Sequence, residues 1–248
     1  MTRRGSGPKP SRILDKLEVN YSAGHWELLA SLRKHALAIL EGLGQWRASA
    51  LIHGSLARGD VDEKSDIDIV IPISVGTQLV EARLEAAGFQ IASREIAQAT
   101  PMHSPKAHLY LDLEQKTGLT IPLSSFRRLE EEFYRFGGTV SGKGIVDNVR
   151  SKGCTKKLTL IEPTESGHLE SPIIGRESEV AVILGISSDI VRERVRVLAR
   201  RDTIGRTGIF LKMPVPEGVA FEEALEQETR NNPALRRTLR RRKAVQKG

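Results

Sequence analysis

The chain has 248 residues, of which 39% are hydrophobic and 28% are charged, and its formal net charge is +7. This composition is typical of a globular protein with one large domain or two small ones, and it excludes disordered and fibrous chains. Aromatic residues make up 4% of the chain, which argues against a binding surface built mainly on base stacking. A single cysteine, Cys154, and the lack of any long apolar run favour a soluble cytoplasmic protein without a membrane segment.

The positive charge is concentrated at the two ends of the chain. Residues 230–248 carry +8 and residues 1–16 carry +4, whereas residues 17–229 have a net charge of −5. This distribution predicts a mildly acidic body with two basic arms that suit a polyanionic partner. We therefore expect RNA or DNA as a partner, with sequence-independent, salt-sensitive contacts from the run that contains Arg240, Arg241 and Arg242.

In chain order, the pattern predicts a flexible basic arm over residues 1–19, followed by mixed helices and strands. Apolar residues recur at helical spacing from His25 to Leu43, where Gly42 and Gly44 favour the end of a helix. Alternating polar and apolar residues predict strands further on. The expected elements are strands at 50–52, 65–71, 90–96, 107–114 and 119–123, and a helix at 79–87. This mixture predicts a sheet domain of the α+β class that ends near residue 128.

The second half of the chain has a different character. Residues 137–153 contain five glycines, and residues 141–158 contain five basic residues against one acidic residue, which favours a mobile basic connector over residues 129–170. Helical spacing returns from Ser178 onward, so we expect a second, smaller domain over residues 171–213. A linker and a basic tail over residues 214–248 then complete the predicted organisation.

Two aspartates that follow a glycine-serine turn form the most informative pattern of the chain. Asp66 and Asp68 alternate with Ile67 and Ile69, so in a strand both carboxylates lie on one face, about 7 Å apart. Two carboxylates this close repel each other unless a cation neutralises them. Because the expected ligands are oxygens, we expect Mg²⁺ or Mn²⁺.

The glycine-serine turn precedes these aspartates by ten residues. Gly54 and Ser55 lie where a strand passes into a helix, and a small residue at such a turn lets the backbone approach phosphate oxygens. Arg58, one turn further on, is a candidate for the same phosphates. A carboxylate metal site beside a phosphate turn is what nucleotidyl or phosphoryl transfer requires.

These residues resemble a known signature. Gly54-Ser55-x-x-x-Gly59 followed by Ser65-Asp66-Ile67-Asp68 is similar to the motif of the DNA polymerase beta-type nucleotidyltransferase superfamily. The resemblance implies a mixed sheet with flanking helices over residues 20–128. It also implies transfer of a nucleoside monophosphate (NMP) from a nucleoside triphosphate (NTP) to a hydroxyl, with release of pyrophosphate. Gly54 and Ser55 would hold the triphosphate, and Asp66 and Asp68 would ligate the metal ions.

The superfamily also has a third carboxylate on a later strand. Asp112 is our candidate for this catalytic and metal-binding role, because the leucines beside it share one strand face and Asp112 takes the other. Glu114 shares the face of Asp112, and Glu95 lies on an earlier expected strand. Both glutamates therefore remain alternatives.

A second pattern lies between Glu179 and Leu198. Gly185 permits a turn between two helices and Ser187 is placed to cap the second helix. Val191, Val195 and Leu198 form an apolar stripe on that helix, whereas the polar stripe suits a phosphate backbone or a groove. The polar stripe consists of Arg192, Arg196 and Arg200. With a hairpin wing over Thr203 to Lys212, this segment resembles a winged helix-turn-helix.

The two domains together resemble predicted nucleotidyltransferases of archaeal type. We therefore expect a metal-dependent, NTP-using nucleotidyltransferase whose acceptor lies on nucleic acid. The alternative is a non-catalytic factor that binds nucleic acid or ribonucleoprotein and retains a degenerate nucleotidyltransferase fold.

Overall fold

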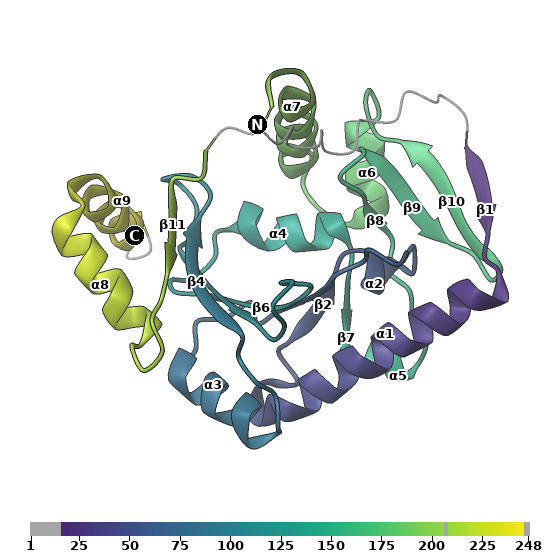
Figure 1. Ribbon diagram of the computed structural model, residues 1–248. Helices are drawn as coiled ribbons and strands as arrows, with labels where there is room; N and C mark the ends of the chain where they lie inside the picture. The colour runs from purple at the N-terminus through teal and green to yellow at the C-terminus, as the bar shows by residue number, and fades with distance from the viewer. Residues whose placement is uncertain (1–15, 206–207, 246–248) are drawn as a thin grey trace, which may run out of the picture. The chain divides into compact units, whose positions relative to one another are not determined.

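The computed structural model describes residues 16–205 and 208–245 (Figure 1). These residues divide into two compact units, which are described separately below. Unit 1 comprises the described residues up to Ala38 together with 51–68 and 128–208, and unit 2 comprises 39–50, 69–127 and the residues from Ile209 onward. No helix among the described residues is both long and apolar enough to span a membrane.

Unit 1 begins with a strand and the long first helix, and it contains the glycine-serine turn. The burial of Ala36 and Leu29 on one side of that helix agrees with the expected helical period. The elements of unit 1 are β1 (Leu17–Asn20), α1 (Ala23–Gly42, to Ala38), β2 (Leu51–His53), α2 (Ser55–Arg58), the start of β3 (Ile67–Val70), α4 (Arg128–Gly137), β7 (Thr139–Ser141), α5 (Gly142–Val146), β8 (Gly153–Cys154), β9 (Thr159–Pro163), β10 (Gly167–Pro172), α6 (Glu177–Leu184) and α7 (Ser188–Ile204).

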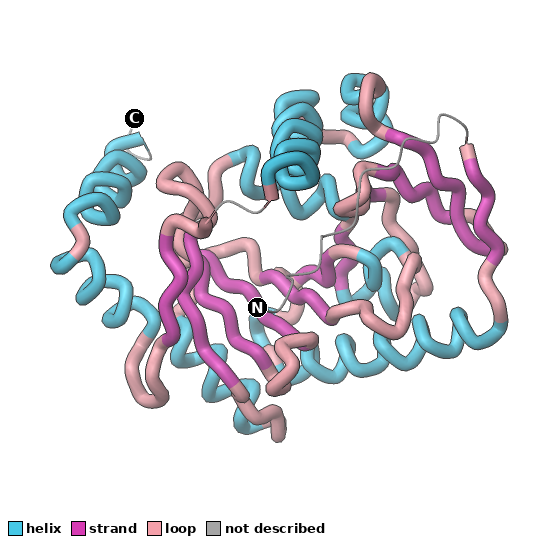
Figure 2. Tube along the Cα trace, turned by 45° about the horizontal axis from the view of Figure 1, so that its top comes forward, coloured by secondary structure: helices cyan, strands magenta, loops and turns pink. Residues whose placement is uncertain are grey.

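Four of these strands form an antiparallel sheet in the order β1-β10-β9-β8, and Figure 2 shows β1, β10 and β9 side by side. β2 pairs antiparallel with β7, with Ile52 opposite Val140, and β3 is the other neighbour of β2. A hydrophobic core joins the four-stranded sheet to α4, α6 and α7. It includes Phe136, Leu160, Val180, Val191 and Leu198.

Unit 2 is built on antiparallel strands in the order β11-β4-β5-β6, with the end of β3 next to β6. Alternate residues are buried on β5 and β6, among them Leu109 and Leu119, which face each other in the register. This alternation is the strand pattern expected from the sequence. The elements of unit 2 are the end of α1, a short 3-10 helix at Gly44–Trp46, α3 (Thr77–Ala86), β4 (Ser93–Gln98), β5 (Lys106–Tyr110), β6 (Thr117–Pro122), β11 (Leu211–Pro214), α8 (Phe221–Asn231) and α9 (Pro233–Val245).

The expected mobile connector over residues 129–170 is folded, which corrects the prediction from sequence. It contributes α4, β7, α5, β8, β9 and β10. Its glycines allow backbones to pass closely, because a Cβ atom built on Gly153 would lie 2.6 Å from the backbone nitrogen of Gly138. Glycine in this segment therefore serves packing, and the local composition gave a misleading signal of flexibility.

The two expected arms also differ from the prediction. Residues 1–15 of the N-terminal arm lie outside the described residues, but Leu17–Asn20 form β1 and pair with β10. The C-terminal segment, expected as a linker and a disordered tail, forms α8 and α9. Phe221 and Leu235 are fully buried there. Packing of these apolar side chains therefore stabilises two helices that the charge pattern did not predict.

The wing expected over Thr203 to Lys212 is a further correction. α7 continues to Ile204, and β11 then pairs antiparallel with β4, with Leu211 opposite Gln98. In the part of the segment that the structure describes, no hairpin forms. All four residues of β11 pair with residues of β4. Pairing within a larger sheet is more stable than an isolated two-stranded hairpin. The predicted domain over 171–213 thus retains its helix pair but not its wing.

Candidate functional site

The glycine-serine turn lies at the end of β2, as expected. Gly54 has φ 84° and ψ −144°, a conformation that glycine adopts without strain, and it precedes α2. Its N–H donates a hydrogen bond of 3.0 Å to the carbonyl oxygen of Gly138, which anchors the turn to the chain after α4. A Cβ atom built on Gly54 would have no atom within 4 Å, so the backbone at the turn is open to a ligand.

A chain of hydrogen bonds joins this turn to the start of β3. The hydroxyl of Ser55 donates to the hydroxyl oxygen of Ser65 at 3.2 Å, and Ser65 immediately precedes Asp66. Ser65 is itself held in a turn, because its Oγ accepts from the backbone N–H of Asp62 at 2.9 Å. The two halves of the sequence motif are therefore adjacent in space, and Ser65 is the residue that joins them.

Asp66 and Asp68 flank the buried Ile67 at the start of β3, and both aspartates are exposed to solvent. Although solvent reaches Asp68, the pKa of its carboxyl is raised, first by desolvation from the surrounding protein and then by the negative charge of Asp66. The two carboxylates therefore share one electrostatic environment, as the alternation in sequence predicted. A divalent cation fits this pair because it would relieve their repulsion and take carboxylate oxygens as ligands.

Two further residues of unit 1 face this environment and were missed from the sequence. Lys156, an exposed residue of the turn between β8 and β9, lowers the pKa of Asp68 through its charge. Tyr134 of α4 is buried, and its pKa is raised by desolvation and then by the negative charges of Asp68 and Glu130. Both lie more than sixty residues from the motif, in a segment whose local pattern indicated only a connector.

Arg58 has a different place from the one expected. Its side chain is buried, Nη1 donates to the carbonyl oxygen of Gly137 at 2.6 Å, and Nη2 forms an ion pair of 2.8 Å with Asp60. The guanidinium is thus used inside the protein, where it ties α2 to the end of α4. The structure therefore gives Arg58 the position of a residue that supports the turn.

The candidate third carboxylate, Asp112, belongs to unit 2 and lies beyond the end of β5, in the turn to β6. Its two oxygens accept hydrogen bonds from the backbone N–H groups of Lys116 at 3.0 Å and Thr117 at 2.6 Å. These bonds outweigh desolvation and lower the pKa of Asp112.

The two alternatives to Asp112 are both ion-paired. Glu95 pairs with Lys212 at 2.9 Å and Glu114 pairs with Lys116 at 2.6 Å. Among the residues that the structure describes, no group of three or more histidine, cysteine, aspartate or glutamate side chains could hold a metal ion. The described carboxylates therefore offer a pair, Asp66 and Asp68, and no complete three-carboxylate set.

The helix pair expected after the connector is present in unit 1. Gly185 ends α6 in the left-handed region at φ 62°, and α7 follows with Val191 and Leu198 buried. The predicted basic stripe is exposed, with its three arginines on the solvent side of the helix. These arginines are Arg192, Arg196 and Arg200.

The other basic residues expected to contact nucleic acid lie on α9. Arg240 and Arg241 are exposed there, whereas the side chain of Arg242 lies outside the described residues. The run is helical over the described part of this segment, so its basic side chains are presented from a helix.

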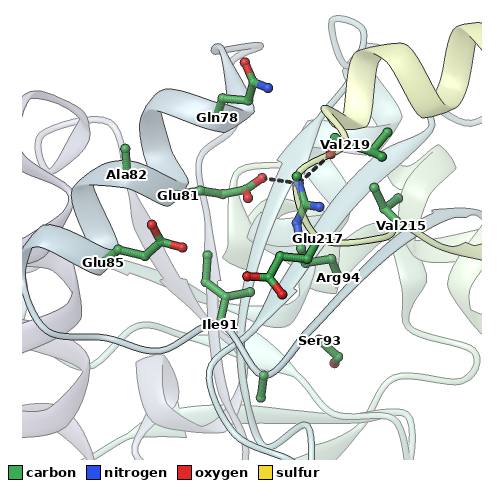
Figure 3. Close-up of a pocket in the computed structure, with 12 residues that line it drawn as sticks. Gln78, Glu81, Ala82, Glu85, Ile91, Ser93, Arg94, Val215, Glu217 and Val219 are labelled. Carbon is green, nitrogen blue, oxygen red and sulfur yellow. Dashed lines mark hydrogen bonds and ion pairs between the residues drawn. The ribbon is translucent and has the colours of Figure 1, made fainter.

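Unit 2 also contains a cavity of about 500 Å³ between α3, β4 and the β11–α8 connection (Figure 3). Arg94 lines it, and its Nη2 bonds Glu81 and the carbonyl oxygen of Val219, both at 2.8 Å. Glu85 and Glu217 add exposed carboxylates. None of the site residues expected from the sequence lines this cavity.

Comparison with known proteins gives one family. The family described as "Nucleotidyltransferase domain" matches residues 32–117, a range that includes the glycine-serine turn, both aspartates and Asp112. This match supports the nucleotidyltransferase superfamily and a nucleotidyl transfer function for the matched segment. No curated protein and no solved structure matched the chain.

Proposed function

We propose that the protein transfers an NMP from an NTP to a hydroxyl acceptor on nucleic acid, in a reaction that depends on Mg²⁺ or Mn²⁺. The observation that carries this proposal is the hydrogen bond between Ser55 and Ser65, because it places the open glycine turn beside the aspartate pair. The acceptor oxygen would bond to the α-phosphorus while the bond to the β-phosphate oxygen breaks and pyrophosphate leaves.

Each residue of this site has a separate role in the proposal. Gly54 and Ser55 would bind phosphate oxygens through the open backbone and the hydroxyl, and Asp66 and Asp68 would hold the metal ions. When bound, the metal would supply electrostatic stabilisation of the charge that develops on the phosphate oxygens. Asp112 is proposed as the third carboxylate, which would accept the proton of the acceptor hydroxyl.

A nucleic-acid acceptor is favoured by two exposed sets of arginines. Arg192, Arg196 and Arg200 project from α7, and Arg240 and Arg241 project from α9. Clustered arginines bind phosphates through charge and through hydrogen bonds from the guanidinium.

The test is a transfer assay with each labelled NTP, Mg²⁺ and total RNA, followed by the same assay with DNA. We expect labelled product that depends on the metal and is lost in the Asp66→Ala/Asp68→Ala double variant. The Glu165→Ala/Glu223→Ala double variant is the matched control, because it removes two exposed carboxylates outside the proposed site. Absence of transfer to RNA and DNA by the wild-type protein would overturn the proposal.

A second candidate function is a non-catalytic factor that binds nucleic acid. The observation that favours it is the lack, among the described residues, of a three-ligand metal group. This function predicts salt-dependent RNA or DNA binding that survives the Asp66→Ala/Asp68→Ala change, with no labelled product for any NTP. The two functions therefore separate in the same set of assays.

A further inference from the structure

The first turn of α7, which a DNA-reading helix of this type would insert into a groove, is held against α4. The Ser187 hydroxyl, at the position before α7, donates a hydrogen bond to the Glu132 carboxylate. Arg128 of α4 lies 3.5 Å from Glu132 and 3.5 Å from Asp189, in the first turn of α7. A network of four side chains therefore covers the end of the helix that would have to enter the groove.

The charges at the first turn of α7 are also unfavourable for its entry into a groove of DNA. Asp189 is 61% exposed at its side chain and is paired with Arg128 at 3.5 Å, so the first turn presents a carboxylate and a guanidinium already engaged with it where the phosphates on both sides of a groove would have to approach. Further along α7, the guanidinium of Arg194 lies 5.0 Å from the centre of the Phe133 ring on α4. α7 is thus fixed along one side, and its first turn carries an acidic group at the surface.

The opposite side of α7 has the reverse character. Arg192, Arg196 and Arg200 are exposed and follow one another at every fourth residue, which spaces them by about 6 Å and gives a stripe of about 12 Å. Within the described part of the chain, neither Arg196 nor Arg200 has an ion pair, and Arg192 has only a contact of 3.9 Å with Asp189. The stripe therefore has positive charge that the protein itself leaves largely uncompensated.

We infer that α7 binds the phosphate backbone of a nucleic-acid duplex side-on, through Arg192, Arg196 and Arg200, and does not read bases with its first turn. The inference rests on the nucleic-acid partner proposed above and specifies how that partner is held. A duplex is favoured over a single strand because residues 188–204 contain no aromatic side chain, and surfaces for single strands combine positive charge with aromatic stacking. A stripe of about 12 Å spans roughly three to four phosphates of one strand.

Two properties follow from this mode of binding. Contacts to phosphates carry no direct sequence information, so the affinity of α7 for a duplex is independent of base order. Each phosphate contact releases a counterion, so the affinity falls steeply with salt. Replacement of the three arginines by lysine retains most of the binding, because a point charge is sufficient for a phosphate.

The experiment measures fluorescence anisotropy of a labelled DNA duplex of about 20 base pairs across a range of salt concentrations. The protein carries Asp66→Ala/Asp68→Ala, so the result does not depend on transfer activity. We expect the Arg192→Ala/Arg196→Ala/Arg200→Ala variant to bind at least about tenfold more weakly at low salt, with a slope of log K against log salt that is less steep by about 2 to 3. The corresponding triple lysine variant should retain the wild-type slope, which would attribute the weaker binding of the alanine variant to the loss of positive charge.

The matched control is Lys34→Ala/Arg47→Ala/Lys143→Ala, which removes three exposed positive charges outside α7 and leaves the slope unchanged. Two unrelated duplexes bind within about twofold of each other, and selection from a randomised duplex pool gives no motif. An enriched motif, tighter stripe-dependent binding of the single strand, or an unchanged slope in the triple alanine variant would each overturn the inference. Absence of transfer by the wild-type protein, together with the expected binding results, would contradict the proposed function and leave the inference standing.

Discussion

The guanidinium of Arg58 donates a hydrogen bond of 2.6 Å to the carbonyl oxygen of Gly137, which connects the helix after the phosphate turn to the end of α4. The same guanidinium pairs with Asp60 at 2.8 Å, and both side chains are largely buried. α4 also carries Tyr134, whose pKa is raised by desolvation and then by the charge of Asp68. Arg58 therefore lies between the two parts of unit 1 that form the proposed site.

The Arg58→Ala variant should lose stability through this connection. It leaves Asp60 as a buried charge and the Gly137 carbonyl without its donor, so we expect the free energy of unfolding to fall by about 3 kcal/mol. Urea denaturation at neutral pH measures this change. Arg47→Ala is the control, because Arg47 forms only an exposed pair with Glu41 and should change stability by less than about 1 kcal/mol. If Arg58→Ala weakened NTP binding without loss of stability, the supporting role assigned to Arg58 would be wrong.

The aspartate pair predicts a stabilising effect of metal ions. Because desolvation, and then repulsion from Asp66, raises the pKa of Asp68, a bound divalent cation should stabilise the folded protein. Mg²⁺ at about ten times its dissociation constant should raise the free energy of unfolding by about 1.4 kcal/mol, which corresponds to a Tm increase of a few degrees. Thermal denaturation with Mg²⁺, and with NaCl at equal ionic strength, measures this increase.

The Asp66→Asn/Asp68→Asn variant tests whether the effect comes from this pair. Its Tm should not respond to Mg²⁺, and without metal its Tm should equal or exceed that of the wild type because the repulsion is gone. An equal Mg²⁺ response in the variant and the wild type would place the cation elsewhere.

The contribution of Asp112 to stability and its proposed contribution to catalysis can be separated by comparing its alanine and asparagine variants. Its carboxylate accepts two backbone hydrogen bonds in the turn between β5 and β6, so Asp112→Ala should lower the free energy of unfolding by about 1 to 2 kcal/mol. If Asp112 is also the third carboxylate, Asp112→Asn should reduce kcat about a hundredfold or more while costing less stability than the alanine change. Steady-state kinetics and urea denaturation of both variants give the comparison. A stable Asp112→Asn variant with unchanged kcat would leave Asp112 only its role in the turn.

The local parts of the site could be predicted from the sequence. Gly54, Ser55, Asp66 and Asp68 lie within fifteen residues, and the period of two in a strand already places both carboxylates on one face. The exposed stripe and the buried stripe of α7 follow in the same way from the period of 3.6. In both cases the information that sets the geometry is contained in a short stretch of the chain.

The remaining parts depend on contacts between distant segments. Lys156 and Tyr134 reach the site only because the glycine-rich segment folds, and nothing in the composition around them indicates this. Ser187 was expected to cap α7, but its hydroxyl bonds Glu132, which lies 55 residues away. Likewise β11 pairs with β4 and not with its own neighbours. In each of these segments, contacts with distant parts of the chain stabilise a structure that differs from the one the local sequence favours.

Two half-buried histidines with lowered pKa values predict loss of stability in mild acid. Burial, and then the charge of Arg58, lowers the pKa of His53 to about 4. Burial, and then the charge of Lys106, lowers the pKa of His108 to about 4. In the unfolded chain both imidazoles have a pKa near about 6.5, so between these values the unfolded state binds more protons. The stabilising contribution is therefore complete above about pH 6.5 and is lost progressively as the pH falls toward about 4.

The change can be measured by urea denaturation at about pH 7.5 and about pH 5. For the wild type we expect each histidine to cost about 2 kcal/mol over this interval. His53→Gln and His108→Gln should each reduce the pH dependence by that amount, whatever their stability at the higher pH, and the double variant should reduce it by the sum. His35→Gln is the control, because His35 is exposed on α1. If His53→Gln kept the full pH dependence, the imidazole of His53 would have to be accessible to protons in the folded protein, contrary to its packing against Phe133 and Tyr134 of α4.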